Sequence, residues 1–270
     1  MTSYECSNRS KCSLIVAVNN EDVLENCLLK SPDIHAFCQI IPKRDFPSAG
    51  EAYNAGISNA MHEILIFSHQ DVYLPPGWLT SLQSAIDRLD GFDPHWGVVG
   101  VFGIAKAGGT AGYIYSTGLK KILGEPSTCV IEAQSLDEML LVTRRSRDLF
   151  FDEKLPGFHL YGTDICLEAK RRGMKSYIIS AFCIHNSNGI QFLPGAFWRS
   201  YFFLRSKWWC ELPVTTPCTV ITKSALPVVK YVLTMGRAVL SFPDQGRRCA
   251  DPHLLYENLG VHREGPQLRG

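Results

Sequence analysis

The sequence predicts an α/β fold in which helices flank a mostly parallel, mixed sheet, and three features indicate it. Short apolar runs of the kind that buried parallel strands use recur along the chain. Helical patterns alternate with these runs across short connections, as in a doubly wound sheet. Polar clusters follow several of the runs, and in open α/β sheets ligands bind just beyond the carboxyl ends of the strands. The sequence therefore predicts a ligand site at that edge.

The composition describes an ordinary globular protein, with 46% hydrophobic and 20% charged residues and a net charge of +1. This charge gives no reason to expect a nucleic acid as partner. The N-terminus lacks the apolar core of a signal peptide, and no apolar stretch approaches the ~18–20 residues that span a bilayer. The ten cysteines are scattered and form no CxxC pair, so we expect reduced thiols in a cytoplasmic protein.

The first part of the chain alternates between strand and helix. We expect a strand over 12–18, a helix capped by Asn20 or Asp22, a strand over 37–41 stopped by Pro42, a helix over 46–60 and a strand over 63–68. The second helix is rich in small residues, which allow close approach to a sheet or a ligand: Ala52, Ala55, Gly56 and Ala60.

The strand over 63–68 runs directly into His69-Gln70-Asp71, a polar cluster with no apolar face to bury. A proline pair then ends the strand, and a helical pattern begins at Trp78. A carboxylate beyond the end of such a strand is a natural ligand for a divalent metal that carries a diphosphate. Asp71 on its own would suit a turn or a helix cap equally well.

The later elements follow the same pattern. We expect a strand over 96–104, a flexible loop over 108–112, a strand over 135–143, a helix capped by Thr163 and ended by Gly173, and a strand over 177–184 that leads into His185. We divide the chain into a main domain over 12–190, a helical extension over 191–241 and a poorly ordered tail over 242–270.

The extension carries eight aromatic residues between Phe192 and Trp209, interleaved with Arg199, Arg205 and Lys207. Lys223, Lys230 and Arg237 then recur every seven residues, on one side of an expected helix. Two interpretations stay open for residues 192–240. They form an acceptor lid or a homodimer face, where aromatic rings pack and stack on sugars, or they meet the inner face of a membrane as a peripheral contact.

Four segments together resemble the family 2-type nucleotide-sugar glycosyltransferases of the GT-A fold, and most of all the streptomycin-biosynthesis-type glycosyltransferase-like proteins. They are SAGEAYNAGISNA, IFSHQDVYLPPGW, FDEKLPGFHLYGTDICLEAKRRG and CIHNS. The resemblance covers roughly residues 12–190 and implies a GT-A fold there. It also implies an inverting, hexosyltransferase-like enzyme that moves a sugar from a nucleoside-diphosphate sugar to a hydroxyl acceptor.

The resemblance also implies a metal site. The family's Asp-x-Asp motif reads His69-Gln70-Asp71 here, so a histidine replaces the first carboxylate. By resemblance, Asp71 and His185 would be the protein ligands of a divalent metal. Imidazole favours Mn²⁺ over Mg²⁺. His69 would contact the ribose or have a structural role, and His185 would otherwise bond to the backbone at its strand end.

The resemblance places the general base in an acidic pair at a helix start, a position that Asp164 occupies with Thr163 in place of the usual Glu. The base must lie within ~3 Å of the acceptor oxygen. Glu168, one turn later, is the second candidate, and direct attack with one base predicts inversion. Alternatively, Asp164 only supports the helix dipole.

The nucleotide is expected at the exit of the first strand, near Ala17, Asn19 and Glu21, with Asn54, His69 and Gln70 beside it. Asp137-Glu138 either touches the donor sugar or the acceptor, or is a solvated pair. Because the Asp-x-Asp motif is altered, the alternative function is a catalytically weak or inactive GT-A-fold protein that binds nucleotide or nucleotide sugar as a binding module.

Overall fold

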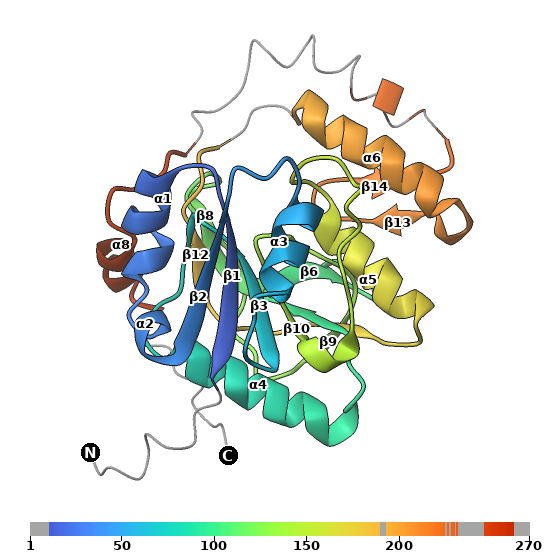
Figure 1. Ribbon diagram of the computed structural model, residues 1–270. Coiled ribbons are helices and arrows are strands. Elements are labelled where there is room, and N and C mark those ends of the chain that lie inside the picture. Colours follow the sequence, from blue (N-terminus) through green and yellow to red (C-terminus); the bar gives the residue numbers. More distant parts are fainter. Residues whose placement is uncertain are drawn as a thin grey trace.

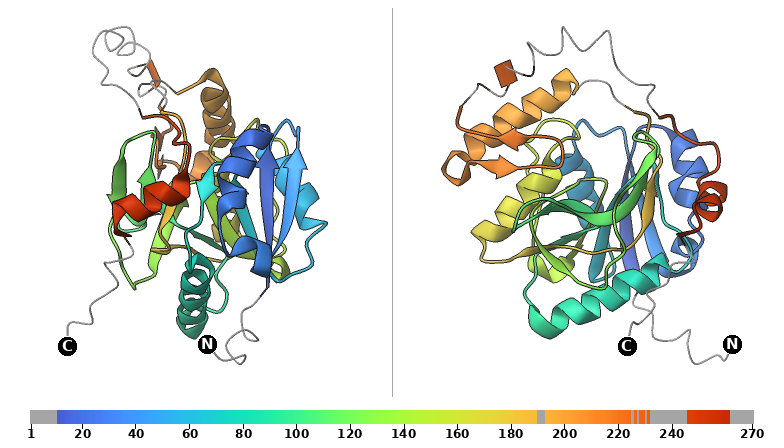
Figure 2. Two further views of the ribbon diagram at one scale, coloured as in Figure 1. Left: turned by 90° about the vertical axis from the view of Figure 1, so that its left-hand side faces the viewer. Right: turned by 180° about the vertical axis from the view of Figure 1, so that it is seen from behind.

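The computed structural model describes residues 11–189, 193–224, 226, 228–229, 231 and 246–261. A large mixed sheet curls through the molecule, and helices cover its faces (Figures 1 and 2). Its strands are β1 (Cys12–Val18), β2 (Cys38–Arg44), β3 (Ile64–His69), β4 (Val72–Tyr73), β5 (Val98–Gly100), β6 (Phe102–Ala105), β7 (Thr110–Ser116), β8 (Lys121–Gly124), β9 (Ile131–Leu136), β10 (Leu140–Arg144), β11 (Ser176–Ile178) and β12 (Cys183–His185). Their order across the sheet is β2-β1-β3-β10-β5-β11-β9-β6-β7-β12-β4, with β8 paired to β7.

The helices pack on both sides of the central strands, and strands such as β1 and β3 are accordingly buried on both faces. The helices are α1 (Glu21–Asn26), α2 (Ile34–Phe37), α3 (Ala49–Ile57), α4 (Trp78–Phe92), α5 (Tyr161–Arg171), α6 (Gly195–Lys207) and α8 (Pro252–Leu259). In β1, Leu14 and Val16 pack with α1, α2 and α4, whereas Ile15 packs with α3, α5 and α6. This alternation is the period of two that a strand imposes.

The mostly parallel sheet that the sequence predicts is found only in one part of the molecule. Strands β2, β1, β3, β5 and β11 run in the same direction, with β10 reversed between β3 and β5. In the described sheet as a whole, however, antiparallel pairings outnumber parallel ones. Two of the antiparallel pairings, β6 with β7 and β7 with β8, follow from the short turns that join these strands, because a short turn can join only antiparallel neighbours.

Several expected boundaries are wrong. Pro42 does not end the second strand, because β2 lies at the sheet edge, where a missing N–H need not break a ladder bond. The three later strands each split in two, giving β5 and β6, β9 and β10, and β11 and β12. Helix α5 begins at Tyr161, so Thr163 lies inside the helix and does not cap it.

The cap at Asn20 and the close approach of the small-residue helix are confirmed. The Asn20 side chain accepts a hydrogen bond from the Val23 N–H at the start of α1. A Cβ atom added at Gly56 would lie 2.2 Å from a methyl carbon of Ile15 in β1. Helix α3 therefore needs glycine there to lie this close to the sheet.

In the described residues, the extension after residue 192 is only partly helical. Helix α6 is followed by a short antiparallel pair, β13 (Val214–Thr215) and β14 (Val220–Ile221), and both lie beside α5 (Figure 1). Residues 190–192, 225, 227, 230 and 232–241 lie outside the described residues, and with them the expected Lys230 and Arg237 positions.

An aromatic and basic surface lies on this extension. Phe202 and Trp209 are 44% and 45% exposed, and Arg205 and Lys223 lie over the Trp209 ring. The alternatives of an acceptor lid, a dimer face and a membrane contact stay predictions. No helix among the described residues is both long and apolar enough to cross a bilayer.

The expectation of a poorly ordered tail is wrong for residues 246–261. Asp251 caps α8, and Tyr256 packs with Tyr73 and Ile184 of the sheet. The Tyr73 hydroxyl also lies 2.7 Å from Nδ1 of His253. Local composition suggested disorder, but apolar contacts with the sheet hold this segment in place.

Candidate functional site

The curl of the sheet brings two distant strand ends together. After β3 ends at His69, the chain passes through Gln70 and Asp71 into β4, which pairs with β12 at the other end of the sheet. The register sets Val72 opposite His185, and the Asn186 N–H donates to the Asp71 carbonyl at 2.8 Å. Pairing of β4 with β12 therefore places His185 beside Asp71.

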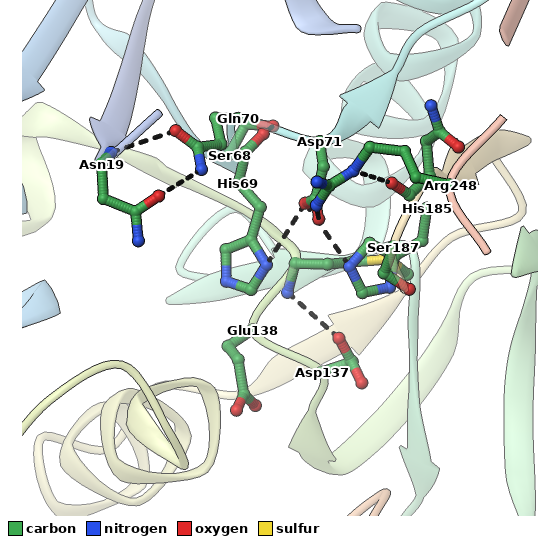
Figure 3. A network of polar contacts seen from close by, with 12 residues as sticks. Asn19, Ser68, His69, Gln70, Asp71, Asp137, Glu138, His185, Ser187 and Arg248 are labelled. Atoms are coloured by element: carbon green, nitrogen blue, oxygen red, sulfur yellow. Dashed lines mark hydrogen bonds and ion pairs between the residues drawn. The ribbon is translucent and has the colours of Figure 1, made fainter. Parts of the chain in front are cut away.

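Three side chains at this point could hold one metal ion. Oδ1 of Asp71 lies 3.6 Å from Nε2 of His185 and 4.0 Å from Nδ1 of His69, as Figure 3 shows. One ligand atom from each residue lies within 4.8 Å of the other two. The two imidazoles and one carboxylate are a donor set that suits Mn²⁺ and other transition metals better than Mg²⁺.

The hydrogen bonds of His69 leave its Nδ1 atom, which faces Asp71, free to bind a cation. The Tyr161 hydroxyl donates its proton to the Glu138 carbonyl at 2.7 Å and lies 2.8 Å from Nε2 of His69. Since that hydroxyl has only one proton, Nε2–H of His69 must donate to it. A neutral His69 then presents an unprotonated Nδ1 toward Asp71, so two electron-rich atoms face each other. A cation between them would satisfy both, which is the usual role of a partner behind a ligating histidine.

The pKa shifts of the three side chains bear on whether they can bind a metal ion. Burial opposes the ionisation of Asp71, but His185, His69 and Arg248 lower its pKa. Burial also lowers the pKa of His69, so its neutral form is favoured. For His185, burial is outweighed by Asp71, which raises the pKa. A metal ion would have to displace the proton that His185 otherwise shares with Asp71, as metal binding to histidine generally does.

A second carboxylate lies at the start of α5, and it belongs to Glu138. The turn between β9 and β10 contains Asp137 and Glu138, both half-buried. Oε1 of Glu138 accepts a hydrogen bond from the N–H of Leu160, the residue before α5, at 3.0 Å. Burial, with the nearby Asp137, raises the pKa of Glu138 to about 8.

Asp164 occupies a different environment. It is 3% exposed, and its carboxylate accepts hydrogen bonds from Lys207 Nζ at 2.9 Å and Trp208 Nε1 at 2.6 Å. Lys207 also pairs with Asp152 at 2.7 Å. The role of Asp164 as general base does not agree with these contacts, because both of its oxygens are buried and accept hydrogen bonds from the end of α6. Burial raises the pKa of Asp164 against the effect of Lys207.

The second candidate, Glu168, is also occupied. It forms ion pairs with Arg171 and Arg172 at 2.7 and 2.8 Å on the surface of α5. The hydrogen bond from the Arg171 side chain lowers the pKa of Glu168, and Arg172 adds to this effect. These are the contacts of a surface carboxylate that stabilises its own helix, so they do not support a catalytic role.

The residues expected around the nucleotide divide into two groups. Asn19 and Gln70 bond to each other across the exits of β1 and β3, and Ala17 lies opposite His69 in the strand register. Glu21 lies at the same edge but pairs with Arg44. Asn54 does not point to this group, because its amide bonds to Phe151 and Glu153 and holds that loop.

The contacts of Asp164 predict a stability effect. Asp164→Asn should destabilise the protein by about 3–5 kcal/mol, the usual cost of leaving one partner of a buried ion pair uncompensated. Differential scanning calorimetry with Glu168→Gln as the control should show a clearly lower Tm for the Asp164 variant only. An Asp164 variant with unchanged Tm but no activity would restore the general-base role.

The sequence did not indicate the contacts that Tyr161, Glu138 and Arg248 make at this site. Tyr161 precedes Asp164 in the LYGTD segment, and Glu138 was expected, together with Asp137, either to touch the donor sugar or the acceptor or to be a solvated pair. Arg248 lies 177 residues from Asp71, in a polar stretch that carries no signal for a site, yet its guanidinium donates to Oδ2 of Asp71 at 2.9 Å.

The chain is similar to several known proteins. The curated protein "ATP synthase subunits region ORF 6" of Fuscovulum blasticum is 31% identical over 130 residues, and the match spans 47% of this chain and about half, 52%, of that relative. Among solved structures, GalNAc-T7 with UDP, GalNAc and Mn²⁺ is similar with 11% identity and a TM-score of 0.49, covering 78% of this chain and 52% of that one. The mannosyltransferase PcManGT from Pyrobaculum calidifontis, in complex with GDP-Man and Mn²⁺, is similar with 12% identity and a TM-score of 0.43, covering 96% and 81%.

A family model described as "Glycosyltransferase like family" matches residues 13–203. This match includes β1, the His69-Gln70-Asp71 turn, α5, His185 and most of α6. It therefore spans well over half of the chain and the whole of the candidate site except Arg248. This chain belongs to the glycosyltransferase-like family.

Proposed function

We propose that this protein is an inverting, metal-assisted glycosyltransferase of GT-A type, which moves a sugar from a nucleoside-diphosphate sugar to a hydroxyl acceptor. The observation that carries the proposal is the group of His69, Asp71 and His185 at the carboxyl end of β3, in a chain of this family. Ligands of open α/β sheets bind at this edge.

His69, Asp71 and His185 would hold the metal, with Mn²⁺ favoured by the two imidazoles. A bound divalent cation would act as a Lewis acid toward the diphosphate leaving group. Asn19 and Gln70 lie at the adjacent strand exits, Asn19 exposed and Gln70 half-buried, so their amides can contact the nucleotide. Ala17 has a small side chain at the same edge and leaves space beside them.

We assign the general base to Glu138 in place of Asp164. The acceptor oxygen attacks the anomeric carbon, the bond from that carbon to the diphosphate oxygen breaks, and Glu138 takes the hydroxyl proton. This direct displacement inverts the anomeric centre. The resemblance places the base at a helix start, and Glu138 supplies the carboxylate that receives the Leu160 N–H there. A raised pKa of about 8 makes Glu138 a stronger base than an ordinary carboxylate.

Calorimetric titration with UDP, GDP, CDP and dTDP tests the proposal, with Mn²⁺ and after chelation. One of the four should bind at least about tenfold more tightly with Mn²⁺, since the cation neutralises the diphosphate. A nucleotide sugar that contains this nucleoside diphosphate should then be consumed, and the nucleoside diphosphate should be released. Binding without turnover of the donor would favour the binding-module alternative, and no binding at all would contradict the proposal.

A further inference from the structure

A short C-terminal segment, residues 246–250, lies across the candidate site. Its backbone bonds to the loop that follows His185: the Gly189 N–H donates to the Gly246 carbonyl, and the Arg248 N–H donates to Oδ1 of Asn188. The Asn186 side chain completes the attachment, because its amide both donates to the Cys249 carbonyl and accepts from the Cys249 N–H. These bonds fix the segment next to the metal-binding residues.

Arg248 of this segment binds the oxygen of Asp71 that the imidazoles do not face. Its Nη2 donates to Oδ2 of Asp71 at 2.9 Å, and its Nε donates to the Asn186 carbonyl at 2.7 Å. Oδ1 of Asp71 is the oxygen that faces His69 and His185. The two oxygens of one carboxylate therefore have separate partners, so Arg248 and a metal ion could bind Asp71 at the same time.

The guanidinium also has capacity for a ligand. Its side chain is 30% exposed, and within the described part of the chain Nη1 makes no hydrogen bond. An arginine that is held by one carboxylate and keeps an open N–H edge is well suited to bind a phosphate oxygen. Because Arg248 is bonded to Asp71, this arginine lies next to the residues that would hold the metal ion.

We propose that Arg248 is a donor-positioning residue that binds the diphosphate of the donor beside the metal ion. The proposal rests on the function proposed above. The diphosphate of a nucleotide sugar carries about two negative charges and Asp71 one, so a divalent cation leaves about one negative charge unbalanced. Arg248 supplies that balance and would also stabilise the additional charge of the departing nucleoside diphosphate.

The test compares Arg248→Ala and Arg248→Lys with Arg247→Ala, in which the adjacent, exposed arginine is removed. Calorimetry measures binding of inorganic pyrophosphate and of the nucleoside diphosphate, each with Mn²⁺ and after chelation, and Mn²⁺ alone. Arg248→Ala should weaken both phosphate ligands about 10- to 100-fold with and without metal, as expected for a lost charge-assisted hydrogen bond. Arg248→Lys should recover part of this loss, and Arg247→Ala should change little.

Other results would overturn the proposal. If Arg248→Ala binds Mn²⁺ more tightly and the phosphate ligands as well as the wild type, Arg248 competes with the metal and does not bind the donor. If all Arg248 variants bind pyrophosphate normally while the wild type keeps its Mn²⁺-dependent nucleotide binding, this inference fails and the proposed function stands. If the wild type binds no nucleoside diphosphate, both fail together. Thermal melting of each variant identifies a loss of binding that comes from unfolding.

Discussion

Replacing Asp71 by asparagine is expected to abolish Mn²⁺-dependent nucleotide binding and to lower kcat/KM for sugar transfer by roughly 10³-fold or more. Asp71 is the only carboxylate among the three candidate ligands, and its Oδ1 is the atom that both imidazoles face. Asparagine keeps the size of the side chain but removes the negative charge. Titration calorimetry with Mn²⁺ and the matching nucleoside diphosphate measures the first effect, and release of nucleoside diphosphate from the donor measures the second.

The matched control for this experiment is Asp22→Asn. Asp22 lies on α1 near the same edge of the sheet but outside the metal group, so its charge can be removed without changing the ligands. Asp71→Asn also leaves Arg248 without its carboxylate, and a melting curve is therefore needed beside the binding data. A folded Asp71→Asn variant that still binds nucleotide only with Mn²⁺ would show that the metal lies elsewhere.

Replacing Glu138 by glutamine is expected to lower kcat by about 10²- to 10⁴-fold and to leave nucleotide affinity unchanged, the effect of removing a general base. Glutamine retains an oxygen for the Leu160 N–H but cannot accept the acceptor proton. Steady-state kinetics with a saturating donor measures kcat. Glu168→Gln is the control, because its carboxylate is paired with Arg171 and Arg172 and should not affect the rate.

The pH dependence gives Glu138 a second signature. A base acts only when deprotonated, and burial with Asp137 raises the pKa of Glu138 to about 8. Wild-type kcat/KM should therefore rise with pH until about 8, and the residual activity of Glu138→Gln should lack this rise. A wild-type profile that is flat between pH 6 and about 9 would contradict the assignment of Glu138 as base.

The same shift predicts a difference in stability. A carboxyl whose pKa is raised on folding binds more protons in the folded state, so its contribution to stability is present below its unfolded pKa and is lost as pH rises toward about 8. Glu138→Gln avoids this loss. Its Tm should exceed that of the wild type above pH 8, and a lower Tm there would show that Glu138 is held chiefly for stability.

The sequence by itself determined the local features of this protein. Short apolar runs predicted β1 and β3, the preference of Asn for helix starts predicted the cap at Asn20, and the family segments pointed to Asp71 and His185. The glycine at position 56 likewise predicted the close approach of α3 to the sheet. Each of these depends on residues that are near neighbours in the chain.

Only the tertiary structure decided which side chains share the site. Whether the carboxylate at the start of α5 comes from Asp164 or Glu138 depends on where that helix begins and on how the β9–β10 turn packs against it. The contact of Arg248 with Asp71 depends on β4 pairing with β12 and on α8 docking against the sheet. These are pairings between segments far apart in the chain, and the periodicity of one segment carries no information about which distant segment will complete its hydrogen bonds and its apolar contacts.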